Sequence, residues 1–130
     1  MGRRAVVLVV EDEAIIRMNI VHVAEDLGYQ VLEASNADEA IEILESHDEI
    51  RIVFTDVGMP GSMDGLKLAR AISGRWPPIQ LIVTSGRDVS GDPDFPVHGR
   101  FIGKPYMNGQ VAAALREALN AEWAPCSGNP

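Results

Sequence analysis

The chain has 130 residues, of which 46% are hydrophobic, a formal net charge of −8 and one cysteine, Cys126. This length and apolar content predict a single domain whose core needs no disulfide. An acidic chain without a block of Lys or Arg is unsuited to nucleic-acid phosphates, and no apolar run is long enough for a membrane span or a secretory signal. We therefore expect a protein of the reducing cytoplasm that binds neither nucleic acid nor membrane.

Two periods of apolar residues alternate along the chain. Runs of consecutive apolar residues predict buried strands, and spacings of three and four predict helices. Two signals predict helix ends: Gly28, and the two prolines that follow Trp76. Asn36 with Glu39 forms a capping box that predicts a helix start. In chain order we expect a strand at residues 5–10, a helix at 14–27, a strand at 30–34, a helix at 37–44, a strand at 52–55, a helix at 65–75, strands at 81–84 and 101–102, and a last helix capped by Asn108.

Strands that alternate with helices through short connections predict a doubly wound α/β fold, with a five-stranded parallel sheet covered by helices on both faces. Residues 87–100 are the exception, because two prolines, two glycines and three aspartates leave no helix of ordinary length there. We expect one domain at residues 1–121 and a disordered tail at residues 122–130.

Charged and hydroxyl residues follow four of the predicted strands directly. In a parallel sheet all carboxyl ends lie on one edge, so these residues should meet there. Each has an ordinary explanation when taken alone, as a helix cap, a turn residue or a solvated cation, but the set would need a coincidence at four strand ends. The residues are Glu11 and Asp12 after the first strand, Asp56 after the third, Thr84 and Ser85 at the end of the fourth, and Lys104 after the fifth.

These residue types suit phosphoryl transfer to a carboxylate. Closely packed acids repel one another and favour a hard divalent cation with oxygen ligands, which indicates Mg²⁺. Asp56 would be the nucleophile that forms an acyl phosphate, and Lys104 would pair with a phosphoryl oxygen. Alternation along a strand lets either Ser85 or Thr84 face Asp56, but not both.

Four motifs occur in a fixed order: Val10-Glu-Asp-Glu13, Phe54-Thr-Asp-Val-Gly-Met-Pro-Gly61 with Asp64-Gly65, Thr84-Ser-Gly86, and Lys104-Pro105. As a set they resemble the receiver domain of two-component response regulators, over about residues 5–120. The resemblance implies a flavodoxin-like receiver fold that accepts a phosphoryl group from the phosphohistidine of a histidine kinase and later hydrolyses the aspartyl phosphate.

The resemblance also implies a role for each matching residue. It makes Ser85, followed by Gly86, the preferred hydroxyl, with Thr84 as the alternative. The implied roles are phosphoacceptor for Asp56, direct metal ligand for Asp12, outer-shell acid for Glu11, backbone metal ligand for Gly58, phosphate-pairing cation for Lys104, aromatic switch for Phe101, and a cis peptide bond before Pro105.

Two departures from the family pattern stand out. The loop at residues 59–65 is one residue longer than the commonest form. The fourth helix of receivers, which usually helps to report phosphorylation, is shortened or replaced by a loop at residues 86–99. We therefore hypothesise that output or self-association uses a remodelled face, which includes the last helix, with Val89 and Phe95 as contacts; the alternative is an unchanged output.

The sequence thus predicts a single-domain receiver that catalyses only its own phosphorylation and dephosphorylation and is not otherwise an enzyme. The expected partners are a sensor histidine kinase or a histidine phosphotransfer protein, with a homodimer possible. One alternative is an aspartyl-phosphate phosphatase or mutase, although such enzymes place the nucleophile after the first strand. The other is an unphosphorylated binding module of the same fold.

Overall fold

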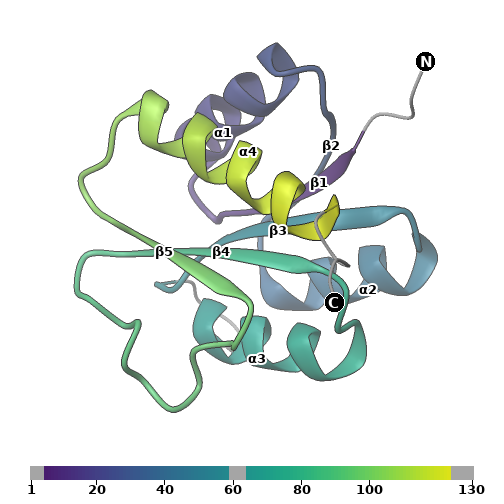
Figure 1. Cartoon of the computed structure of the whole chain (residues 1–130), viewed down its shortest axis with the longest axis vertical. Helices are drawn as coiled ribbons and strands as arrows, with labels where there is room; N and C mark the ends of the chain where they lie inside the picture. Colours follow the sequence, from purple (N-terminus) through teal and green to yellow (C-terminus); the bar gives the residue numbers. More distant parts are fainter. Residues whose placement is uncertain (1–4, 59–63, 124–130) are drawn as a thin grey trace.

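A parallel sheet with helices on both faces forms the body of the protein (Figure 1). The computed structural model describes residues 5–58 and 64–123. In chain order the elements are β1 (Val6–Val10), α1 (Ala14–Asp26), β2 (Gln30–Ala34), α2 (Ala37–Ser46), β3 (Ile50–Asp56), α3 (Gly65–Arg75), β4 (Gln80–Ser85), β5 (Gly99–Gly103) and α4 (Asn108–Trp123). The predicted doubly wound α/β fold is confirmed.

The five strands pair in the order β2-β1-β3-β4-β5, and every pair is parallel. This order reverses direction at β1, and ligands of such open sheets bind at the carboxyl ends of the strands beside that point. Each of the three central strands contains a run of consecutive apolar residues, because both faces of these strands are covered. The sheet therefore brings the ends of β1 and β3 together at one edge.

Two apolar cores lie on opposite faces of the sheet. In Figure 1, α1 and α4 lie side by side over one face, and α2 and α3 cover the other. Alternate strand residues divide between the cores: Leu8 and Val53 pack on the side of α2 and α3, whereas Val9 and Phe54 pack on the side of α1 and α4. The side to which a strand-end residue points therefore follows from its position along the strand.

Local signals account for most of the helix ends. The Asn36 side chain accepts a hydrogen bond from the Glu39 N–H at the start of α2, as predicted. Gly28, just after α1, has a φ of 92°, a left-handed conformation that glycine adopts without steric cost. Asn108 is the first residue of α4 and not its cap as predicted, because its side-chain oxygen accepts from the Asn19 side chain of α1, and the Met107 carbonyl accepts the N–H groups of Gln110 and Val111. Asn108 thus ties two helices together.

The connection between β4 and β5 contains no helix, as expected from its proline and aspartate content. It is built from successive turns, with backbone hydrogen bonds from Asp92 to Val89 and from Phe95 to Asp92. Arg70 of α3 holds the connection through an ion pair to Asp94. Val89 is 1% exposed within the core. The hypothesis that Val89 is a surface contact is therefore wrong: its side chain anchors the connection to the core.

Helix α4 continues to Trp123, past the predicted domain end at residue 121. The predicted long loop falls mainly on residues 59–63, and the rest of the predicted tail on residues 124–130, both outside the described residues. Among the helices that the structure describes, none is long and apolar enough to cross a membrane.

Candidate functional site

Four strand ends place the predicted site residues at one edge of the sheet. Glu11 follows β1, Asp56 ends β3, and Lys104 follows β5. Asp56 pairs in register with Thr84 at the end of β4. The parallel topology therefore collects side chains from residues that are far apart in the sequence.

Three carboxylates meet at this edge. Glu11, Asp12 and Asp56 each offer an oxygen, and these oxygens lie within 4.8 Å of one another. Glu11 and Asp56 are only 4% and 5% exposed, whereas Asp12 is open to solvent. Buried acids so close together repel one another, and a divalent cation would relieve that repulsion.

Glu11 carries the strongest electrostatic perturbation in the site. Its burial, reinforced by the charge of Asp56, raises the pKa of the Glu11 carboxyl from 4.5 to about 7. The Glu13 N–H donates to Glu11 Oε2 at 3.1 Å, which acts in the opposite direction by favouring the ionised form. The acid thus titrates near neutral pH in the metal-free protein.

Lys104 is the cation of the site. Its Nζ lies 2.7 Å from Asp56 Oδ1. Burial lowers the pKa of Lys104, but the hydrogen bond and the charge of Asp56 outweigh that effect, so the pKa is above its ordinary value. Lys104 therefore stays protonated and can attract a second anion to the Asp56 carboxylate.

The two candidate hydroxyls occupy different positions. Thr84 Oγ1 donates to Asp56 Oδ1 at 3.3 Å, whereas Ser85 Oγ accepts the Arg87 N–H at 3.2 Å. Thr84 continues the strand face of Ile82, and Ser85 continues that of Val83 on the opposite side of the sheet. The structure thus brings the alternative hydroxyl, Thr84, to Asp56 and leaves the preferred one, Ser85, bonded to a loop N–H.

The remaining predicted residues surround this centre. A Cβ built on Gly58 would lie 3.8 Å from Asp56 Oδ2, so the Gly58 backbone borders the acids. The Lys104–Pro105 peptide bond is cis, as the resemblance implied. Phe101 of β5 pairs with Val83 and packs, half-buried, on the core of the α2 and α3 side.

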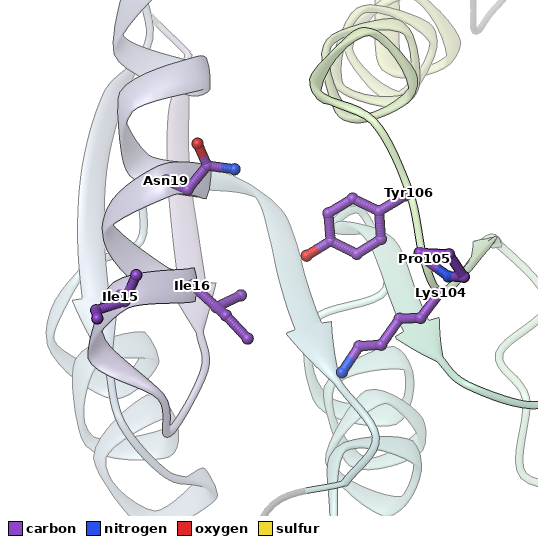
Figure 2. Close-up of a pocket in the computed structure, with 6 residues that line it drawn as sticks. All are labelled: Ile15, Ile16, Asn19, Lys104, Pro105 and Tyr106. Atoms are coloured by element: carbon purple, nitrogen blue, oxygen red, sulfur yellow. The ribbon is translucent and has the colours of Figure 1, made fainter.

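A groove of about 520 Å³ runs beside the charged centre, between α1 and the connection from β5 to α4. Its lining is mostly apolar, and Figure 2 shows Ile16 and the Tyr106 ring facing each other across it. Lys104 borders both the groove and Asp56. The lining residues are Ile15, Ile16, Asn19, Lys104, Pro105 and Tyr106.

The sequence interpretation did not assign a role to Tyr106 or Arg17. Tyr106 directly follows the Lys104-Pro105 motif, and this adjacency could have indicated its place. Burial, together with the charge of Glu11, raises the pKa of the Tyr106 hydroxyl. Arg17 is the sole Lys or Arg within α1, and its partners are a backbone carbonyl and Glu33 of β2, for which the sequence carries no local signal.

Known proteins share this sequence pattern. The sequence model of the response regulator receiver domain matches residues 7–94. The sensor kinase CckA of Brucella abortus is 37% identical over 126 residues, which cover 91% of this chain and 13% of that protein. The aerobic respiration control protein ArcA of Escherichia coli K12 is 31% identical over 117 residues, 88% of this chain and 48% of ArcA. The chain thus spans less than half the length of these two relatives.

Solved structures share the fold. A response regulator receiver protein from Sinorhizobium medicae superposes with a TM-score of 0.84 at 26% identity, over 92% of this chain and 98% of that one. The receiver domain of NtrX from Brucella abortus gives a TM-score of 0.78 at 29% identity, over 88% of this chain and 98% of that one.

Proposed function

Because the chain belongs to the response regulator receiver domain family of two-component signalling, we propose that Asp56 accepts a phosphoryl group from a phosphohistidine. The donor would be a sensor histidine kinase or a histidine phosphotransfer protein. The main support for this proposal is that Asp56 contacts Lys104 and lies close to Glu11 and Asp12 at one edge of the sheet. The domain is a signalling module, and its own phosphorylation and dephosphorylation are the reactions that we propose for it.

The transfer uses groups that are already in contact. An oxygen of the Asp56 carboxylate attacks phosphorus, the bond from phosphorus to the donor imidazole nitrogen breaks, and that nitrogen keeps the electron pair. The product is an acyl phosphate on Asp56. Lys104, now paired with Asp56 Oδ1 at 2.7 Å, pairs with an oxygen of the negatively charged phosphoryl group as Asp56 gives up its own charge to the new bond. The Thr84 hydroxyl, which donates to the same carboxylate, is placed to donate to another phosphoryl oxygen.

The acids fit a magnesium ion. All three side chains offer oxygen ligands, and their spacing within 4.8 Å suits one small, hard cation. Asp12, Asp56 and the Gly58 carbonyl would hold the ion directly, with Glu11 in its outer shell. A bound Mg²⁺ would offset the repulsion between the incoming phosphoryl group and the carboxylates.

The direct test is incubation of the full chain with MgCl₂ and acetyl phosphate, followed by intact-mass measurement. One phosphoryl group adds about 80 Da. A mass that stays unchanged with this donor and with every histidine kinase tried would contradict the proposal.

Mg²⁺ binding should depend on pH through Glu11. Its carboxyl has a pKa of about 7, so it gains a proton and loses its charge as the pH falls below neutrality. We expect the dissociation constant for Mg²⁺, measured by calorimetric titration, to rise about tenfold between pH 8 and pH 6.

Glu11→Gln serves as the matched variant, because its amide oxygen can still accept the Glu13 N–H. It should bind Mg²⁺ more weakly at pH 8 but with little change between pH 8 and pH 6. Without Mg²⁺ at pH 8, it should also unfold at a higher temperature, since a carboxyl with a raised pKa opposes folding once it is ionised. An unchanged pH dependence in Glu11→Gln would contradict this assignment.

We further propose that the phosphodonor protein docks on the groove between α1 and Tyr106. Lys104 borders this groove and contacts Asp56, so a partner seated in it lies next to the phosphoacceptor. The rim is apolar and open, with Ile15 82% exposed. Exposed apolar side chains beside a reactive centre are typical of a protein-binding surface.

Ile15→Ser should affect phosphorylation by a protein donor but not phosphorylation by acetyl phosphate. We expect phosphotransfer from a histidine kinase that phosphorylates the wild type to slow about tenfold, because an apolar contact is lost. The rate with acetyl phosphate should stay unchanged, since a molecule this small does not need the groove. Val97→Ser is the control: Val97 is 89% exposed on the connection between β4 and β5 and does not line the groove. Equal slowing in both variants would argue against docking there.

A further inference from the structure

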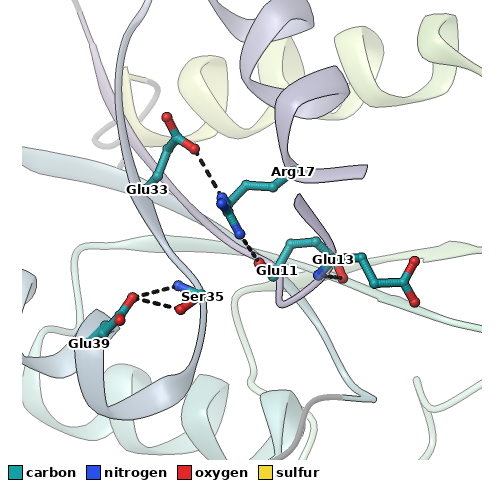
Figure 3. Close-up of polar contacts among 6 residues, drawn as sticks. All are labelled: Glu11, Glu13, Arg17, Glu33, Ser35 and Glu39. Atoms are coloured by element: carbon teal, nitrogen blue, oxygen red, sulfur yellow. Dashed lines mark hydrogen bonds and ion pairs between the residues drawn. The ribbon is translucent and has the colours of Figure 1, made fainter. Parts of the chain in front are cut away.

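Arg17 connects the acidic turn after β1 to the neighbouring strand. Its Nη1 donates to the Glu11 carbonyl oxygen at 2.8 Å, and its Nε lies 2.9 Å from Glu33 Oε1 of β2 (Figure 3). The Arg17 side chain is 20% exposed, so its guanidinium is partly withdrawn from water. The Arg17 side chain thus links the turn after β1 to β2.

The other bonds of Glu11 complete this frame. Its N–H donates to the Ala34 carbonyl at 3.0 Å, and its carboxylate accepts the Glu13 N–H. The Arg17 N–H in turn donates to the Glu13 carbonyl. Hydrogen bonds therefore fix both the N–H and the carbonyl of Glu11, and the donor to the carbonyl is the Arg17 guanidinium.

We propose that Arg17 is a positioning residue for the metal site. By fixing the Glu11 carbonyl, it holds Glu11 and Asp12 at a spacing that a divalent cation can use. This inference rests on the proposed function, which supplies the metal. Carboxylates that repel one another would otherwise move apart, and a cation would have to bring them back together on binding.

The sign of the effect distinguishes positioning from simple electrostatics. A positive charge near a cation site weakens cation binding, so removing the charge of Arg17 would strengthen Mg²⁺ binding if charge were all that mattered. Positioning predicts the opposite. Lys at this place would keep the charge but lose the fork that lets Arg17 contact two partners at once.

The experiment is calorimetric titration of the full chain with MgCl₂, with circular dichroism to show that each variant is folded. We expect Arg17→Met and Arg17→Lys to raise the dissociation constant for Mg²⁺ about tenfold. Arg75→Lys is the matched control, because Arg75 forms an ion pair of the same length with Glu45, between α3 and α2. Its Mg²⁺ affinity should equal that of the wild type.

Glu33→Gln gives a second route that does not touch Arg17 itself. It should weaken Mg²⁺ binding by a smaller factor, and adding it to Arg17→Met should cause no further loss, because Glu33 acts through Arg17. Folded Arg17 variants that bind Mg²⁺ as tightly as the wild type, or more tightly, would overturn the inference. A wild type that binds no Mg²⁺ would instead contradict the proposed metal site.

Discussion

With MgCl₂ and acetyl phosphate, the wild-type chain should gain about 80 Da and Asp56→Asn should gain nothing. An amide is a poor nucleophile, and the substitution keeps the size of the side chain, so the loss would report the chemistry of one group. The structure supports this expectation because Asp56 is the acid that contacts both Lys104 and Thr84. Asp26→Asn, at the exposed end of α1, is the control and should be phosphorylated like the wild type.

Asp12→Asn separates the proposal from an enzyme that uses the first-strand acid as nucleophile. In a receiver, Asp12 helps to hold the metal, so its variant should be phosphorylated slowly but still on Asp56. In the alternative, turnover of a small phosphomonoester would be lost in Asp12→Asn and kept in Asp56→Asn. That second pattern would contradict the assignment of Asp56.

Most of the fold follows from periodicity, because consecutive apolar runs and helical spacings are local. The convergence of Glu11, Asp56 and Lys104 could also be predicted, since parallel strands share one carboxyl edge. The choice between Thr84 and Ser85 depends on a non-local quantity, the register of β4 against β3. Only the pairing of Asp56 with Thr84 shows which hydroxyl shares the face of the acid.

The role of Arg17 was missed for a related reason. Its partners are a backbone carbonyl on the preceding turn and Glu33 on β2. Sequence patterns describe one helix face at a time, and they do not show which backbone atoms a long side chain will reach. The burial of Val89 was not predicted because the nearby prolines and aspartates suggested a solvent-exposed loop, whereas successive turns place the Val89 side chain in the core.

Gly65→Ala should be the most damaging small substitution next to the site. A Cβ at residue 65 would overlap the Asp56 carbonyl oxygen and lie 2.9 Å from Thr55 Oγ1. The obstacle is mainly backbone, at the point where the Gly65 N–H donates to the Val57 carbonyl at 3.0 Å. Since the start of α3 and the end of β3 would have to move apart, we expect the free energy of unfolding to fall by about 3 kcal/mol, measured by urea denaturation.

Gly74→Ala is the matched control in the same helix. No atom lies within 4 Å of a Cβ built there, so alanine should leave stability unchanged or raise it by up to about 1 kcal/mol through its better helix propensity. If Gly65→Ala were as stable as Gly74→Ala, the close approach of α3 to Asp56 would be disproved. Because the obstructing carbonyl belongs to Asp56 itself, whatever Gly65→Ala protein remains folded should also be phosphorylated more slowly than the wild type. The close approach at Gly65 thereby links the start of α3 to the position of Asp56, the proposed phosphoacceptor.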